Sequence, residues 1–245
     1  MDSYQAFLKA RREKPTRVSG GQTPAARGTE YGDAVVQPLF GGKTIGLADE
    51  GSYFVATNPT PGTGIAGIAD PATFADTKAL VVLKNTSETL SVYLDYLNLT
   101  VTAAGTNATN LYWVAKLDNI TRWSSGGSAI TPVNTNMDST TAAAVDLRFG
   151  AAVAVAAGSS ARLIGHGVVR TVIPVVADQY RFVFGGSEVA AVHSPMSTIG
   201  TAIAYAVVPV APVVLGPGDS LLFHTFSGSQ SGAHSFEFSL GFWQR

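Results

Sequence analysis

A chain of 245 residues is long enough to bury one large hydrophobic core, or two small ones, without covalent cross-links. It contains no cysteine, which excludes disulfide bonds and thiolate metal sites. Charged residues make up 13% of the chain and hydrophobic residues 46%, so the surface must consist largely of Ser, Thr, Asn, Gly and apolar atoms. Such a surface favours a protein that packs against neighbours, although an uncharged β-sandwich would have the same composition.

The first 32 residues are predicted to form a basic N-terminal arm that begins with a short helix. Residues 1–30 contain six Lys and Arg against three Asp and Glu, which gives 6 - 3 = +3, and the formal charge of -1 for the whole chain leaves -4 for the rest. Asp2 followed by Gln5 resembles a capping box, and Pro15 ends the helix. The segment from Pro15 to Gly32 has no hydrophobic periodicity and is expected to be extended.

The arm contains the residues that we expect to bind a partner. Its helix combines an apolar face with a cluster of basic residues, and such clusters release counterions when they bind phosphate. Because the charge is small, docking on a neighbouring protein is favoured over nucleic acid, and a solvated tail is the alternative. The candidate residues are Tyr4, Phe7, Leu8, Lys9, Arg11, Arg12, Lys14 and Arg17.

Neither export nor membrane insertion is expected from the apolar segments. The N-terminal residues lack the continuous apolar stretch of a secretory signal. The run from Ala202 to Leu215 is interrupted by Pro209 and Pro212, which are awkward in a membrane-spanning helix. We therefore predict no membrane partner.

Residues 33–245 are predicted to form a single all-β domain, an antiparallel β-sandwich of the jelly-roll or Greek-key type. Long connections at 58–71 and 123–140 favour Greek-key crossings over simple hairpins. A helix of one or two turns is expected at 71–76, with Asp70 as its cap. The predicted strands are 34–40, 52–57, 78–84, 89–102, 110–117, 142–149, 161–176, 179–184, 202–208 and a closing pair within 220–243.

Two of these strands carry patterns that predict finer detail. In 89–102 the apolar residues change phase after Tyr96, which indicates a bulge or bend between Asp95 and Asn98. The last strand alternates strictly, which indicates one buried and one wetted face. Its two sets are Phe236, Phe238, Leu240 and Phe242 on the buried face and Ser235, Glu237, Ser239 and Gly241 on the other.

No complete catalytic, metal-binding or nucleotide-binding motif is present in the sequence. Gly62, Gly64 and Gly67 have the spacing of a dinucleotide-binding loop, but Asp70 and a proline follow where a long helix should begin. His224 and His234 flank the last loop, and two imidazoles make an incomplete metal site. We predict no cofactor, no metal and no catalytic residue, and therefore a protein that is not an enzyme.

The end of the chain, within residues 213–245, contains the densest part of a resemblance to a known class of proteins. It reads Val-Leu-Gly-Pro-Gly-Asp-Ser-Leu-Leu-Phe-His-Thr and then Ser-Phe-Glu-Phe-Ser-Leu-Gly-Phe-Trp-Gln-Arg. Together with the basic arm and the charge-poor, cysteine-free sandwich, it resembles structural proteins of tailed bacteriophage particles. The resemblance implies a jelly-roll-like virion component made in the host cytoplasm, of the head decoration or the neck or tail attachment type. Its partners would be other virion proteins and copies of itself, as a trimer or a ring.

Three functions follow as hypotheses, of which a non-enzymatic structural component of a bacteriophage particle is the leading one. The first alternative is a carbohydrate- or receptor-binding β-module, in which exposed aromatics such as Trp113 and Trp123 would be stacking platforms. The second alternative is a glycoside hydrolase-like enzyme with carboxylates dispersed in the sequence. A row of exposed aromatics would favour the binding module, and a cleft with two close carboxylates would favour the hydrolase.

Overall fold

The computed structural model describes residues 43–68, 73–150, 154–155, 161–185, 193–194 and 203–245. The chain divides into two units, residues 1–46 and 47–245, and the description below concerns the second. The predicted arm lies outside the described residues, with its candidate residues from Tyr4 to Arg17 and its boundary at residue 32. The same holds for the strand predicted at 34–40.

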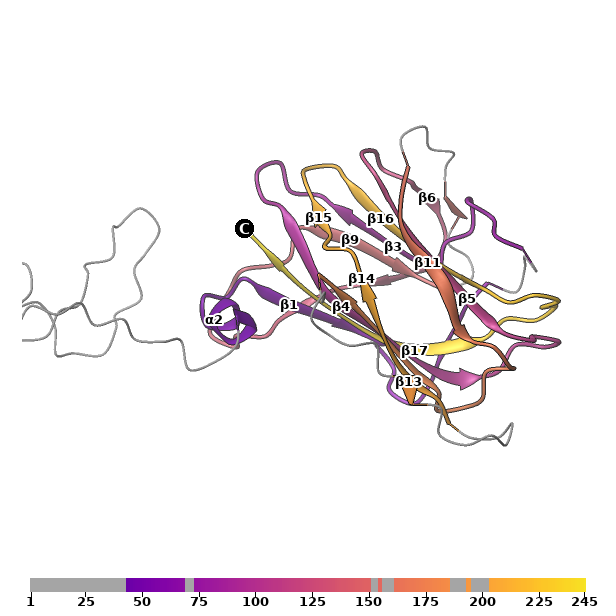
Figure 1. Cartoon of the computed structure of the whole chain (residues 1–245). Coiled ribbons are helices and arrows are strands. Elements are labelled where there is room, and N and C mark those ends of the chain that lie inside the picture. Colours follow the sequence, from indigo (N-terminus) through magenta and orange to yellow (C-terminus); the bar gives the residue numbers. More distant parts are fainter. Residues whose placement is uncertain (1–42, 69–72, 151–153, 156–160, 186–192, 195–202) are drawn as a thin grey trace, which may run out of the picture. The chain divides into compact units, whose positions relative to one another are not determined.

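Two β-sheets make up the second unit (Figure 1). The larger sheet has the order β13 (His193–Ser194), β14 (Tyr205–Val210), β12 (Gln179–Phe184), β4 (Val92–Ala103), β17 (Ser235–Gln244), β1 (Tyr53–Thr57) and β8 (Val133–Asn134), with β15 (Val214–Leu215) paired to β4 and β2 (Ile65–Ala66) to β17. The smaller sheet has the order β11 (Arg162–Arg170), β5 (Leu111–Asp118), β16 (Ser220–Phe226), β3 (Val81–Asn85), β9 (Val145–Phe149) and β7 (Ser128–Ile130). A separate pair consists of β6 (Trp123–Ser125) and β10 (Ala154–Val155). The connections expected at 58–71 and 123–140 are therefore interrupted by short strands, β2 in the first and β6, β7 and β8 in the second, because pairing with distant strands orders them.

The strand order is that of a jelly roll. Eight strands form its frame, which in chain order are β1, β3, β4, β5, β11, β12, β16 and β17. Numbered 1 to 8 in this order, strands 1, 8, 3 and 6 lie side by side in the larger sheet; these are β1, β17, β4 and β12. Strands 2, 7, 4 and 5 lie side by side in the smaller sheet; these are β3, β16, β5 and β11. All pairs within this frame are antiparallel, and β14 adds a parallel strand beside β12. The predicted all-β sandwich of the jelly-roll or Greek-key type is confirmed.

A continuous cluster of buried hydrophobic side chains lies between the two sheets. The predicted core face of β17 is confirmed, because Phe236, Phe238, Leu240 and Phe242 are all buried. The prediction for the other face was wrong at Gly241, which is buried against the side chains of Tyr53 and Tyr96. Aromatic rings connect the sheets directly: Phe238 of the larger sheet stacks on Phe149 of the smaller one with 4.1 Å between ring centroids. Such stacked pairs contribute beyond the area they bury, so the core depends on ring contacts between the layers as well as on apolar area.

The phase change predicted in 89–102 corresponds to a β-bulge in β4. Gly241 of β17 lies opposite Tyr96 and Phe242 lies opposite Leu94, so Asp95 is the extra residue. The bulge allows Leu94 and Leu97, three positions apart, to face the same core. Asp95 itself is turned away from the core and accepts a hydrogen bond from the hydroxyl of Tyr53 at 2.8 Å.

The helical predictions were wrong in two places. Helix α2 (Lys43–Asp49) was not predicted, although Gly51, with φ of 70°, closes it in a Schellman motif. Residues 73–76 form a bend and a turn instead of the helix expected at 71–76, and the rest of that stretch lies outside the described residues. Side-chain contacts of Phe74 and Asp76 with the smaller sheet explain this turn, since tertiary contacts override a local cap signal. Among the described helices, none has the length and apolarity that a membrane crossing requires.

Candidate functional site

The outward face of the larger sheet carries two rows of polar side chains. Residues two apart on a strand share a face, and the register between strands decides which of them become neighbours. Four strands contribute to the rows, namely β17, β4, β12 and β14. The first row is Glu237, Thr100, Gln179 and Tyr205, and the second is Ser239, Asn98 and Arg181.

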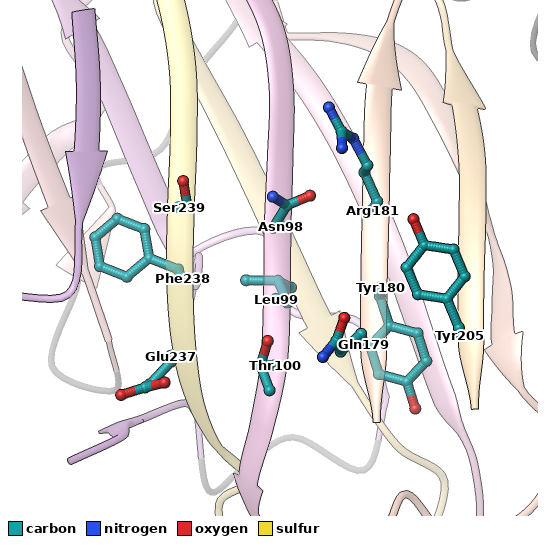
Figure 2. Close-up of a pocket in the computed structure, with 10 residues that line it drawn as sticks. All are labelled: Asn98, Leu99, Thr100, Gln179, Tyr180, Arg181, Tyr205, Glu237, Phe238 and Ser239. Atoms are coloured by element: carbon teal, nitrogen blue, oxygen red, sulfur yellow. The ribbon is translucent and has the colours of Figure 1, made fainter. Parts of the chain in front are cut away.

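These seven residues line a hollow of about 290 Å³, which we name the polar hollow. Figure 2 places Tyr205 on one side of it and Glu237 and Ser239 on the other. The Tyr205 residue is 42% exposed, so its ring is accessible to a ligand. Leu99, Tyr180 and Phe238 also border the hollow, but all three are buried. A ligand in the hollow would therefore meet amides, hydroxyls, one guanidinium, one carboxylate and one phenol ring.

The polar hollow contains one carboxylate and one guanidinium, and each of them contacts a neighbouring group. The Glu237 carboxylate accepts a hydrogen bond from the backbone amide of Gly62. The Arg181 guanidinium lies 4.9 Å from the ring centroid of Tyr96, whose hydroxyl is 3.2 Å from the Ser239 hydroxyl. One positive and one negative side chain make the hollow neutral overall, which favours a ligand without net charge.

Several amides and hydroxyls of the polar hollow lack a hydrogen-bond partner in the described part of the chain. They belong to the side chains of Asn98, Thr100, Gln179 and Tyr205. The side-chain oxygen of Asn98 is also shielded from solvent. A ligand therefore cannot reach that oxygen, and the groups open to a ligand are the side chains of Thr100, Gln179 and Tyr205.

Asp178 holds the strands of the hollow together at the end where Gln179 and Tyr205 lie. Its buried carboxylate accepts hydrogen bonds from the backbone amide of Ala204 at 2.7 Å and from the hydroxyl of Tyr180 at 2.9 Å. It therefore connects the beginning of β12 to the residue before β14. This contact fixes the relative positions of Gln179 and Tyr205, which the parallel pairing of the two strands alone would set less firmly.

The outward face of the smaller sheet has a hollow of about 240 Å³ with an aromatic lining, which we name the aromatic hollow. Tyr112 stacks on Phe226 with 5.0 Å between ring centroids, and Phe74 lies beside Phe226. Phe74 and Leu163 are exposed hydrophobic residues at its border, 39% and 56% exposed. Its apolar character contrasts with the polar hollow, and it suits contact with another protein surface.

Two carboxylates near the aromatic hollow share one arginine. Arg122 donates hydrogen bonds to Asp118 and to Asp76, each at 2.7 Å, and Lys116 also contacts Asp76. Burial alone would raise the pKa of Asp76, but the hydrogen bonds and charges of Lys116 and Arg122 lower it below its usual value. Because these cations neutralise the carboxylates, this cluster stabilises the fold and does not have the free acid and base of a hydrolase.

The two histidines that flank the last loop have different partners. His224 forms an edge contact with Phe74 and lies 3.3 Å from the backbone oxygen of Asp76, whereas Nδ1 of His234 accepts a hydrogen bond from the backbone amide of Gly105. Burial lowers the pKa of each histidine to about 4. The described residues contain no group of three or more His, Asp or Glu that could hold a metal ion.

We expect acid to destabilise the protein through these histidines. Between the ordinary pKa of about 6.5 and the folded value of about 4, the unfolded chain binds protons that the folded chain does not. The stabilisation that comes from keeping both imidazoles neutral should therefore be fully present above pH 6.5, and the free energy of unfolding should decrease as the pH falls toward 4. Urea titrations at about pH 7 and about pH 5 measure it.

Variants of the histidines separate this effect from general acid denaturation. His234→Asn keeps a side-chain acceptor for Gly105 and removes the titration, so it should weaken the dependence on pH. His166→Gln, at an exposed position, should leave it unchanged. If the free energy of unfolding depends equally on pH in the wild type, His234→Asn and His166→Gln, then His234 is not a source of this dependence.

The two tryptophans expected as aromatic platforms are buried or half-buried. Trp113 is buried and stacks on Phe223, so it belongs to the core. The ring of Trp123 is covered by the Arg148 guanidinium at 4.2 Å. The exposed ring at the polar hollow is instead Tyr205, which the sequence analysis did not single out.

No family model matches the chain, and comparison with curated proteins and with solved structures finds no match either.

Proposed function

We propose that this protein is a non-enzymatic structural subunit of a bacteriophage particle, which assembles through contacts of its arm and its sandwich with neighbouring subunits. The observation that carries the proposal is the strand order of a jelly roll, an architecture used by viral capsid proteins, lectins and cupins. Architecture alone does not decide between these classes, so the surfaces must be considered as well.

The surface of the sandwich supports a role in assembly. With 13% charged residues, the protein has little of the charge that keeps isolated domains apart in solution. The aromatic hollow exposes Phe74 and Leu163 on the outward face of the smaller sheet, where a neighbouring subunit would bury them. Of the two tryptophans that a binding module would have exposed, Trp113 is buried and Trp123 is half-buried with Arg148 over its ring, which makes the binding module a weaker explanation for the whole chain.

The oligomeric state tests the proposal. The purified protein should form a trimer or a ring, and its sedimentation velocity and native mass should show that species over a wide range of concentrations. A protein that stays monomeric at every concentration, and that does not associate with extracted particles, would contradict the structural role.

The arm provides a second test. Deleting residues 1–32 should leave the circular dichroism spectrum of the sandwich intact, since the jelly-roll frame begins at Tyr53, but should abolish the oligomer or its incorporation into particles. If the arm docks as an apolar helix, the double variant Phe7→Ala and Leu8→Ala should have most of the effect of the deletion.

If the arm binds nucleic acid, replacing Lys9, Arg11, Arg12 and Lys14 with glutamine should weaken the binding of nucleic acid and reduce the dependence of that binding on salt. Normal assembly of the truncated protein would contradict a role of the arm.

A further inference from the structure

We propose that the polar hollow is a binding site for a neutral carbohydrate. This inference goes beyond the structural role and does not rest on it, because a subunit that fails to assemble would still present the hollow. The site consists of the two rows on β17, β4, β12 and β14, lined by Asn98, Thr100, Gln179, Arg181, Tyr205, Glu237 and Ser239.

The free groups of the hollow match the chemistry of sugar hydroxyls. Each hydroxyl of a sugar can donate one hydrogen bond and accept others, and a side-chain amide offers both donors and an acceptor. Gln179, Asn98 and Thr100 have no partners among the described residues. Sugar hydroxyls could pair with the amide of Gln179 and the hydroxyls of Thr100 and Tyr205, which line the hollow.

Tyr205 gives the hollow a ring on which the apolar face of a sugar can stack. Its exposure contrasts with the burial of Trp113, and Figure 2 shows it at one side of the polar rows. An amphipathic ring beside amides suits a ligand with hydroxyls at its edge and C–H groups on its face. The residues stand on paired strands, so little backbone conformational entropy is lost when a ligand binds, and the cost is limited to ordering the side chains.

The charges of the hollow argue against other ligand classes. Nucleic acid is bound through several Lys and Arg, and Arg181 is the one basic residue among those that line the hollow. Glu237 is likewise the one carboxylate in the lining, whereas glycoside hydrolysis needs two. The side chains that face the hollow are mostly polar, unlike the apolar centre of a protein interface. Binding of a neutral sugar without its hydrolysis is the chemistry that fits.

Calorimetric titration of the full chain with maltohexaose, cellohexaose and mannohexaose tests the proposal. At least one of these probes should bind with a dissociation constant on the order of 1 mM, as expected for a shallow polar site. Tyr205→Ala and Gln179→Ala should each weaken that binding about tenfold, because they remove the stacking ring and the central amide. Phe74→Ala is the matched control, since it removes an exposed ring that lies beside the smaller sheet, away from the polar hollow, and it should leave binding unchanged.

Four outcomes would overturn the proposal. The first is no binding of any of the three probes up to about 10 mM. The second is equal affinity of the wild type and Tyr205→Ala, with both proteins folded by circular dichroism. The third is binding of dextran sulfate alone, lost in Arg181→Gln, which would make the site an anion site. The fourth is self-association that Gln179→Ala abolishes, which would make the polar face an interface between copies of the chain.

Discussion

Replacing Phe238 with alanine is expected to lower the free energy of unfolding by about 3–5 kcal/mol. Phe238 is 4% exposed, and its ring stacks on Phe149 at 4.1 Å across the space between the two sheets. The substitution removes apolar area and leaves a cavity, because strands held in a ladder on both sides cannot move in to fill it. Urea titration measures the loss.

Ser239→Ala is the matched control for this prediction. Ser239 is the next residue on β17, faces outward and borders the polar hollow, so its substitution should change stability by no more than about 0.5 kcal/mol. Phe149→Ala should be nearly as damaging as Phe238→Ala, and the double variant should lose less than the sum of both, because the two rings are partners. A loss below about 1 kcal/mol for Phe238→Ala would contradict the central place of this ring pair.

Local patterns in the sequence predicted the longer strands and the face that the last one presents to the core, but the short strands β2, β6, β7 and β8 were missed. The alternation in the last strand depends on neighbouring residues alone, so the burial of Phe236 to Phe242 could be predicted without any knowledge of partners. The bulge at Asp95 was predictable for the same reason, because a phase change in an apolar pattern is itself local. Helix α2 carried a local signal in Gly51, which was missed.

The candidate site could not be predicted, because it depends on pairing between distant segments. Glu237 and Ser239 were expected on a wetted face, but their neighbours Thr100 and Asn98 follow from the register of β17 on β4. Tyr205 reaches the hollow through the pairing of β14 with β12, a parallel addition that no local pattern indicates. The sequence also does not show which face of a sheet an aromatic side chain lies on, and therefore whether a ligand can stack on it.

Trp113 illustrates this limit. Its position on β5 puts it on the inward face, where Gly165 and Gly167 of β11 leave room for its ring: a Cβ at Gly165 would lie 2.8 Å from the indole. The two glycines and the tryptophan are therefore complementary parts of the core. Their spacing in the sequence does not reveal this, since it requires the register between β11 and β5.

The second large effect is expected at Arg122, whose replacement by methionine should lower the free energy of unfolding by about 3–5 kcal/mol. The side chains of Arg122 and Asp118 are both 0% exposed and joined at 2.7 Å. Without the guanidinium, the Asp118 carboxylate would stay in the interior without its cation, and its desolvation would no longer be offset. Asp76 would keep Lys116, so most of the loss should come from Asp118.

Two further variants identify the unpaired charge as the cause. Arg245→Met is the same substitution in an exposed pair with Glu50, where the side chains are 62% and 55% exposed, and it should cost about 0–1 kcal/mol. Arg122→Met combined with Asp118→Asn removes the stranded charge and should recover part of the lost stability in urea titrations. If the double variant is no more stable than Arg122→Met, then lost packing of the arginine stem, and not the isolated carboxylate, accounts for the effect. If Arg122→Met costs no more than Arg245→Met, the buried arginine contributes as little as one in a surface pair. The turn at 73–76 would then be held by the Lys116–Asp76 pair and by Phe74 with its aromatic neighbours.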